Sequence, residues 1–194
     1  AAGTCRMAFM GQNFVDTGYA LGQRMIKDHG LKKGDLIFTP VEFPNAVYAQ
    51  LRHAGVKKAM DEIGATTEIL GTDTDSANAL NLMTQYLVGH PETKAVIGLG
   101  LTPTSQAVRA IKDAGLSIPA GGYDVSPEVI ADIKSGALTA TVDQQPYSQG
   151  FYAVTQMALY LKYGLYPSEM ATGGLGLIDK TNTDKAEVWA GKTR

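Results

Sequence analysis

The sequence predicts an α/β protein, a three-layer α/β/α sandwich around a mostly parallel, doubly wound sheet. Short apolar segments with a period of two alternate with longer segments whose apolar residues recur every three or four positions. Glycines follow several of the helical segments, at Gly30, Gly64, Gly89 and Gly115, where helices commonly end. This alternation is typical of βαβ units, in which a helix connects two parallel strands.

The elements follow one another in a regular order. We expect a strand over residues 6–11 and a helix over 17–29, whose apolar stripe includes Leu21 and Met25. The pattern then repeats, with strands over residues 35–41, 67–70, 95–99 and 120–123 and helices over 46–63, 76–88, 104–114 and 127–134.

A last strand is expected over residues 138–142, followed by a helix that runs through Tyr163. Pro146 lies between them and ends the strand, because proline has no backbone donor for the ladder. Gln144 and Gln145 therefore come directly after a strand, where open α/β sheets usually bind ligands. We expect the crossing at Asp143, Gln145 and Pro146 to act as a hinge.

The composition excludes several classes of function. The formal net charge is −2 and the basic residues are scattered, so no nucleic-acid partner is expected. A single cysteine, Cys5, permits neither an internal disulfide nor a cysteine metal cluster. No apolar run is long enough for a membrane span. The sequence also lacks a nucleophile elbow, a zinc-protease motif and a complete dinucleotide fingerprint. We therefore expect no catalytic residue, metal site or cofactor.

The residues that follow the strands are the candidates for a binding site, because the carboxyl ends of parallel strands share one edge of the sheet. Their amides and carboxylates suit a neutral, polyhydroxylated ligand. A local role as a turn or cap residue stays open for each. The candidates are Asn13, Glu42, Phe43, Asn45, Asp73, Asp124 and Gln144.

Four segments together carry a resemblance to a known family: RHAGVKKAMDEIG, GGYDVSPEVIADIKSGALTAT, VDQQPYSQGFYAV and TGGLGLIDKTN. In this order the chain resembles the type I periplasmic sugar-binding proteins, the solute receptors of ABC importers. The resemblance implies that Arg52, Asp124 and Gln144 contact a sugar. Many members carry Asn-Asp where this chain has Gly100 and Leu101, which implies a bulkier or less polar sugar derivative.

The resemblance also implies how the chain is divided. Residues 1–12 would form the last strand of a first lobe, 13–144 a second lobe, 145–171 a return to the first lobe, and 172–194 a final return strand and tail. Most of the first lobe would then be missing, and it is an expected partner of the apolar helix after Pro146. The other expected partners are a sugar and the membrane permease of an ABC importer. The implied location is the periplasm, or the outer surface of a single-membrane bacterium with a lipid anchor.

Two alternative functions share this fold. A repressor of the lactose-repressor type would use the same lobes as a sugar-sensing effector domain, behind an N-terminal DNA-binding segment. A receptor for a membrane chemosensor would bind the sugar in the same way and differ only in its membrane partner.

Overall fold

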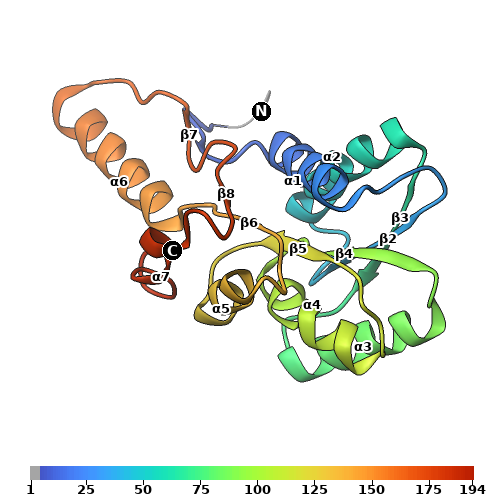
Figure 1. Cartoon of the computed structure of the whole chain (residues 1–194). Helices are drawn as coiled ribbons and strands as arrows, with labels where there is room; N and C mark the ends of the chain where they lie inside the picture. Colours follow the sequence, from blue (N-terminus) through green and yellow to red (C-terminus); the bar gives the residue numbers. More distant parts are fainter. Residues whose placement is uncertain (1–4) are drawn as a thin grey trace.

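A six-stranded sheet lies between two layers of helices in the computed structural model, which describes residues 5–194 (Figure 1). The strand order is β3-β2-β4-β5-β6-β8, and only β8 runs antiparallel to its neighbour. The predicted fold class is therefore confirmed. The strands are β2 (Leu36–Val41), β3 (Thr66–Gly71), β4 (Thr93–Ile97), β5 (Ala120–Tyr123), β6 (Thr141–Val142) and β8 (Leu177–Ile178).

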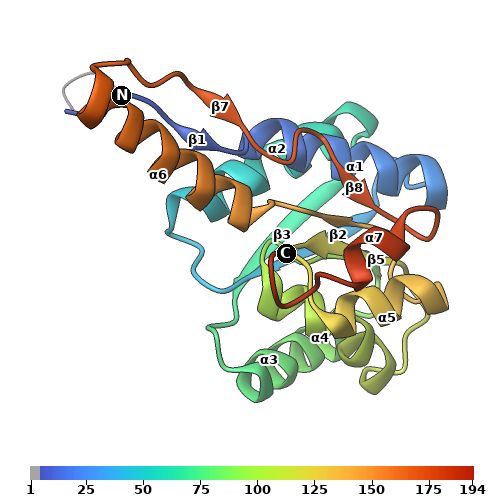
Figure 2. The ribbon, with the colours of Figure 1, turned by 90° about the vertical axis from the view of Figure 1, so that its left-hand side faces the viewer.

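The helices cover both faces of this sheet. One face carries α1 (Phe14–His29) and α2 (Val47–Ile63), and the other carries α3 (Ser76–Gly89), α4 (Leu101–Asp113) and α5 (Pro127–Ser135) (Figures 1 and 2). A separate apolar core fills the space under each layer. The sheet is therefore packed against helices on both faces, and its strand ends remain free to present side chains.

Helices α1 and α2 pack with their backbones in near contact. A Cβ atom on Gly55 would lie 2.1 Å from the carbonyl oxygen of Val15, and one on Gly18 would lie 2.3 Å from that of Arg52. Only glycine permits so close an approach at these two positions. The packing brings the start of α1 next to Arg52 on α2.

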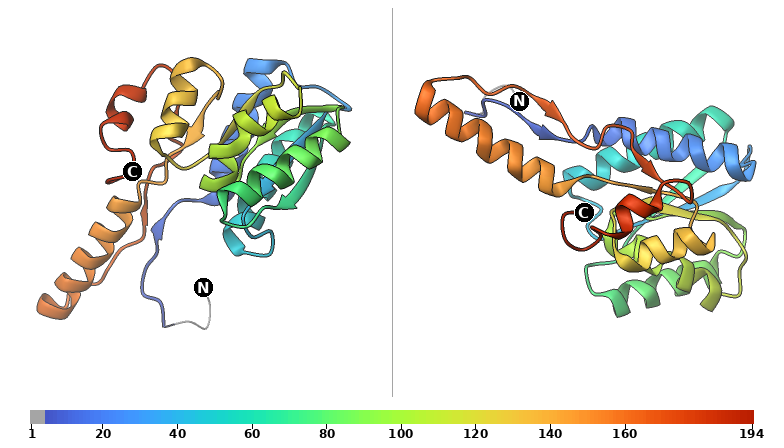
Figure 3. Two further views of the ribbon diagram at one scale, coloured as in Figure 1. Left: turned by 90° about the horizontal axis from the view of Figure 1, so that it is seen from below. Right: turned by 60° about the vertical axis from the view of Figure 1, so that its left-hand side comes forward.

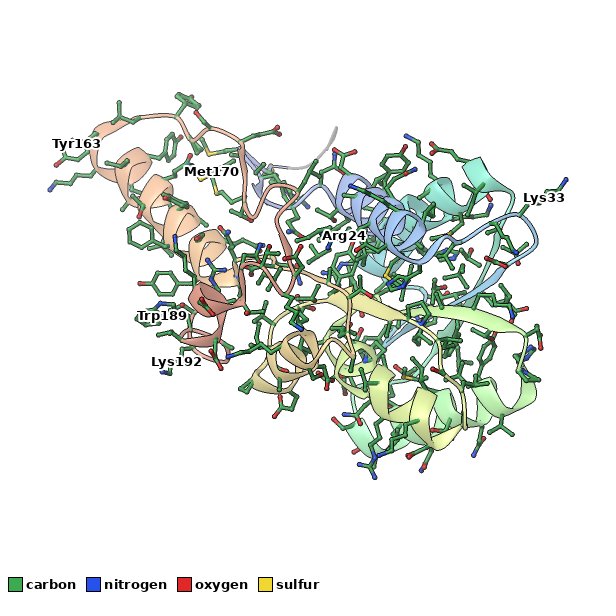
Figure 4. All side chains as sticks on the ribbon, viewed as in Figure 1. Arg24, Lys33, Tyr163, Met170, Trp189 and Lys192 are labelled. Carbon is green, nitrogen blue, oxygen red and sulfur yellow. The ribbon has the colours of Figure 1, made fainter. Side chains whose placement is uncertain are left out.

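An arm projects from the three-layer body (Figure 3). It consists of α6 (Pro146–Tyr163) and a two-stranded parallel sheet of β1 (Met10–Gly11) and β7 (Met170–Ala171). No residue of α6 is buried, although its sequence carries many apolar side chains. Tyr163 lies at the far tip, and Trp189 lies near the base beside α7 (Thr183–Glu187) (Figure 4).

Three segments connect the body and the arm: the chain between β1 and α1, between β6 and α6, and between β7 and β8. Hydrogen bonds join these crossing segments to one another. Gln12 Nε2 donates to the carbonyl oxygen of Asp143 at 2.8 Å, and Thr172 Oγ1 donates to that of Gln144 at 3.3 Å. A Cβ atom on Gly173 would lie 2.4 Å from the same Asp143 oxygen. The three segments therefore form one hydrogen-bonded crossing.

The first and the last predicted strands are longer than the observed ones. The strand expected over 6–11 is confined to Met10–Gly11, because within the described residues it pairs only with the two-residue β7. The strand expected over 138–142 is assigned only to Thr141–Val142, although Thr139 N still donates to Ala120 O at 2.8 Å.

Two helices begin three residues earlier than predicted. Helix α1 starts at Phe14 because the side chain of Asn13 caps it, accepting from Asp16 N at 3.3 Å. Helix α4 starts at Leu101, with Pro103 in its first turn, where a missing backbone donor costs nothing. Within residues 5–194, every helix is too short or too polar to cross a bilayer.

Candidate functional site

The strand order reverses direction between β2 and β4, and a cavity of about 530 Å³ opens at their carboxyl ends. The chain leaves β2 toward one edge of the sheet and returns to place β4 on its other side. Such switch points leave a crevice between diverging loops. The cavity is lined by Phe14, Glu42, Phe43, Tyr48, Arg52, Thr74, Gly100, Leu101, Thr102, Asp124 and Gln144.

Arg52 is the most constrained side chain of the cavity. It projects from α2, is only 3% exposed, and donates from Nη1 to the carbonyl oxygen of Leu99 at 2.7 Å. The guanidinium carbon lies 5.0, 4.9 and 4.2 Å from the ring centres of Phe14, Tyr48 and Tyr123. These contacts fix the plane of the guanidinium group. Its Nε is buried and has no hydrogen-bond partner in the described part of the chain.

Asp124 follows β5 and faces Arg52. Its Oδ2 lies 3.9 Å from Arg52 Nη1, and its Oδ1 accepts a hydrogen bond from Gln144 Nε2. The backbone has a φ of +72°, a left-handed conformation, and is held by bonds to Val142 O and from Thr141 Oγ1. Burial raises the pKa of Asp124 above its ordinary value, and Arg52 and Gln144 only partly oppose this.

Gln144 belongs both to the cavity and to the crossing segments. Its side-chain nitrogen Nε2 donates to Asp124, while its backbone carbonyl oxygen accepts from Gln149 Nε2 at 2.9 Å. The adjacent Asp143 is 3% exposed and accepts from Gln145 N at 2.9 Å and from Arg194 Nη1 at 2.8 Å. A group that binds the Gln144 side chain thus contacts a residue whose own backbone is hydrogen-bonded within the crossing.

Glu42 supplies a second carboxylate from the end of β2. Its Oε2 accepts from the Tyr48 hydroxyl and its Oε1 from Thr102 N, each at 3.0 Å. Burial and the neighbouring Glu42 raise the pKa of Tyr48 to about 12, so this hydroxyl remains a donor. Thr102 N belongs to the first turn of α4, where the helix dipole favours a negative charge.

The aromatic side chains at the cavity divide between its wall and the core beneath it. Phe14, Phe43 and Tyr48 line the cavity, and Phe43 is half exposed. Tyr123 is fully buried beneath Arg52, and its hydroxyl lies 3.0 Å from Thr17 Oγ1. The cavity therefore combines flat apolar surfaces with charged and amide groups, an arrangement suited to a ring that carries hydroxyls.

The structure does not bring every predicted site residue to the cavity wall. Glu42, Phe43, Arg52, Asp124 and Gln144 line it together. Three further candidates lie outside the lining. Asn13 caps α1, Asp73 accepts from Thr74 N at 2.6 Å within its own turn, and Asn45 is exposed in the loop before α2.

The sequence prediction did not assign a contact role to Leu101. Tyr48 precedes Arg52 by four residues on one helix, so the two share a face. Leu101 is an exposed apolar residue at the start of α4. The only sequence signal for its position is the family resemblance, in which many members carry Asn-Asp where this chain has Gly100 and Leu101.

The cavity offers donors, acceptors and aromatic surfaces for reversible binding. In the described part of the chain, no three His, Cys, Asp or Glu side chains are placed to share a metal ion.

A family model described as "Periplasmic binding protein domain" matches residues 1–165. The chain belongs to this family. The xylose/arabinose-binding protein XylF of Sulfolobus acidocaldarius is 27% identical over 177 residues, which are 86% of this chain and 43% of XylF. The ribose import binding protein RbsB of Bacillus subtilis is 30% identical over 116 residues, 60% of this chain and 38% of RbsB. The resemblance found in the sequence is thereby confirmed.

Solved structures of periplasmic binding proteins superpose on the whole fold. A carbohydrate transporter of Acidothermus cellulolyticus, in complex with myo-inositol, is similar with a TM-score of 0.85 and 27% identity, over 97% of this chain and 65% of its own. A solute binding protein of Agrobacterium vitis with bound D-fucose has a TM-score of 0.84 and 24% identity, over 96% of this chain and 64% of its own. At that identity the second similarity shows the fold alone. The chain thus spans less than half of XylF and about two thirds of these structures.

Proposed function

We propose that this periplasmic binding protein chain captures a neutral sugar or polyol for import, without any covalent step. The observation that carries the proposal is the grouping of Arg52, Asp124 and Gln144 in one cavity. An arginine held by three rings, a carboxylate and an amide provide fixed donors and acceptors for hydroxyl groups. The names of XylF and RbsB, which refer to pentoses, support the same ligand class.

Binding would proceed by closure about the crossing segments. Asp143, Gln145 and Pro146 lie where the body passes into the arm, and Gln145 has a left-handed φ of +54°. A ligand that bonds Gln144 acts directly on this crossing, so it favours one arrangement of body and arm over another. We assign residues 13–144 to the sugar-binding second lobe and residues 1–12 and 145–171 to a first lobe, with 172–194 as the return strand and tail.

The exposed face of α6 supports the proposed first lobe. Val154, Met157 and Leu161 are 60%, 56% and 77% exposed, unusually high values for large apolar residues along one helix. A first lobe packed on this helix would bury them and would supply the opposite wall of the cavity. We further propose the permease of an ABC importer as the membrane partner, and the periplasm or the outer cell surface as the location.

The proposal is tested by calorimetric titration of the complete protein that carries this sequence with D-xylose, D-ribose, D-arabinose and myo-inositol. We expect at least one to bind, and Arg52→Ala, Asp124→Ala and Gln144→Ala each to weaken binding by about 1–3 kcal/mol, since each strands a polar partner. Asn78→Ala, which changes an exposed residue of α3 outside the cavity lining, is the control. Three cavity variants that bind like the wild type would rule out the assigned site.

A further inference from the structure

At the switch point of the sheet, the Glu42 carboxylate fills the space that a side chain at position 100 would need. A Cβ atom on Gly100 would lie 2.0 Å from Glu42 Oε2 and 2.4 Å from Oε1. Carbon and oxygen in contact need more than 3 Å, so no side chain fits at position 100 while Glu42 keeps its place. The glycine after β4 and the glutamate after β2 are therefore a matched pair.

The position of Glu42 is set by groups other than a ligand. Tyr48 OH and Thr102 N each donate to one carboxylate oxygen at 3.0 Å. A carboxylate offers about four acceptor positions, so these two bonds leave acceptor capacity unused. Glu42 is only 9% exposed, yet it lines the cavity. Its remaining acceptor positions are thus available to a molecule inside the cavity.

Glu42 also sets the charge of the cavity. The charged side chains of the lining are Glu42, Arg52 and Asp124, two carboxylates against one guanidinium. The guanidinium is already engaged with Leu99 O and lies nearest Asp124. A ligand bearing a carboxylate or phosphate would meet an excess of negative charge in a partly buried site, where repulsion is weakly screened.

We propose that Glu42 is a specificity-determining residue, which selects hydroxyl-bearing neutral ligands over anionic sugars, and that Gly100 is required to make room for it. The inference rests on the proposed sugar binding and deepens it. Glu42 accepts hydroxyl donors at the β2–β4 end of the cavity, as Asp124 does at the β5 end. The ligand accordingly presents hydroxyl donors at two separated positions of its ring.

The test is a double-substitution cycle on the complete protein, with D-xylose, D-ribose, D-arabinose and myo-inositol as neutral probes and D-glucuronate as the anionic probe. Glu42→Gln keeps the size of the side chain and should weaken binding of the best neutral probe about 10-fold or more. Glu42→Ala should weaken it by a similar or larger factor. In both variants, the ratio of neutral to D-glucuronate affinity should fall.

Gly100→Ala should reproduce the Glu42→Ala loss, because its methyl group displaces the carboxylate. In the Glu42→Ala background the same glycine substitution should have almost no further effect, and this double variant has room for the methyl group if the single one fails to fold. Gly89→Ala is the matched control, since a Cβ atom there meets nothing within 4 Å. Independent, multiplicative losses at the two positions would overturn the pairing.

The outcomes separate this inference from the function on which it rests. Tight neutral-sugar binding by the wild type with unchanged affinity in Glu42→Gln would refute the role of Glu42 and leave the proposed function intact. An equal loss for neutral and anionic probes would assign Glu42 a structural role only. Absence of binding by any neutral probe to the wild type would overturn both.

Discussion

Nη1 of Arg52 donates a hydrogen bond of 2.7 Å to the carbonyl oxygen of Leu99, which joins helix α2 to the chain leaving β4. The bond spans the switch point between β2 and β4. Both partners are buried, and the Leu99 side chain is fully covered. The arginine that lines the cavity therefore also stabilises the sheet edge beside it.

The first prediction concerns this bond. Lysine at position 52 keeps the charge but loses the planar fork that stacks against three rings and reaches Leu99 O. We expect Arg52→Lys to lower the free energy of unfolding by about 1–3 kcal/mol, because a buried carbonyl oxygen loses its donor. Urea unfolding measures the change. The matched control is Arg109→Lys on α4, whose side chain is 69% exposed, and an equal loss in both variants would contradict the prediction.

The second prediction concerns Asp124. Because burial raises its pKa, ligand affinity should begin to fall at a higher pH than for an ordinary aspartate, as protonation removes an acceptor. Asp124→Asn should bind more weakly and should lose this pH dependence. Glu42 and Asp143 also raise the Asp124 pKa, so Glu42→Gln should move the transition to lower pH. Calorimetric titrations at several pH values measure both effects.

The raised pKa of Asp124 also makes the free energy of unfolding depend on pH. A carboxylate whose pKa is raised on folding is destabilising above that folded pKa, and the penalty disappears as the pH falls toward the ordinary value. The free energy of unfolding of the wild type, relative to Asp124→Asn, should therefore rise as the pH is lowered through this window. A relative stability that falls instead would show that the pairing with Arg52 outweighs burial.

Periodicity and helix-end residues were sufficient to predict most of the body. The strand over 120–123 coincides with β5, and the predicted helix over 76–88 ends one residue before the end of α3. The short β7 was not predicted, because a two-residue strand has no measurable period and exists only through pairing with β1. Tertiary pairing, which is absent from local sequence patterns, defines such elements.

The sequence also led to most of the charged and amide residues that line the cavity. Strand-end positions and the family resemblance led to Glu42, Arg52, Asp124 and Gln144, which line one cavity. The fit of Gly100 against Glu42 was not predictable, because the two residues are 58 positions apart in the chain and their contact depends on how β2 and β4 are placed. Asn13 and Asp73 were predicted as site residues but have cap and turn roles outside the cavity lining. Asn and Asp side chains suit a cap or a turn as well as a ligand, so their residue type alone could not decide.

The third prediction concerns the crossing segments. Gly173 has a φ of +71°, and a Cβ atom there would also strike Asp143 O. Gly174 has a φ of +53°, but a Cβ atom there would meet nothing within 4 Å. Both alanine variants bear the cost of a left-handed backbone, about 1–2 kcal/mol. Only Gly173→Ala should lower the free energy of unfolding, measured with urea, by more than this amount. It should also weaken sugar binding, because it separates the segments that Gln12 and Asp143 hold together.

The last prediction concerns the packing that positions Arg52. A methyl group on Gly55 would lie 2.1 Å from Val15 O and 2.7 Å from Tyr19 N, and backbone atoms cannot rotate aside as a side chain can. Helices α1 and α2 must then separate, which moves Phe14 away from the Arg52 guanidinium. We expect Gly55→Ala to cost about 1–3 kcal/mol in urea unfolding, as overpacking of a tight core does. Affinity for the sugar should fall as well, although Gly55 does not line the cavity.

Gly150→Ala provides the control, because it also replaces a helical glycine but has open space around the added atom. The higher helix propensity of alanine should leave that variant as stable as the wild type or slightly more stable, by up to about 1 kcal/mol. If Gly55→Ala instead behaved like Gly150→Ala, the close approach of α1 and α2 would not be what holds Arg52. The three aromatic rings and the hydrogen bond to Leu99 O would then have to fix the guanidinium without it.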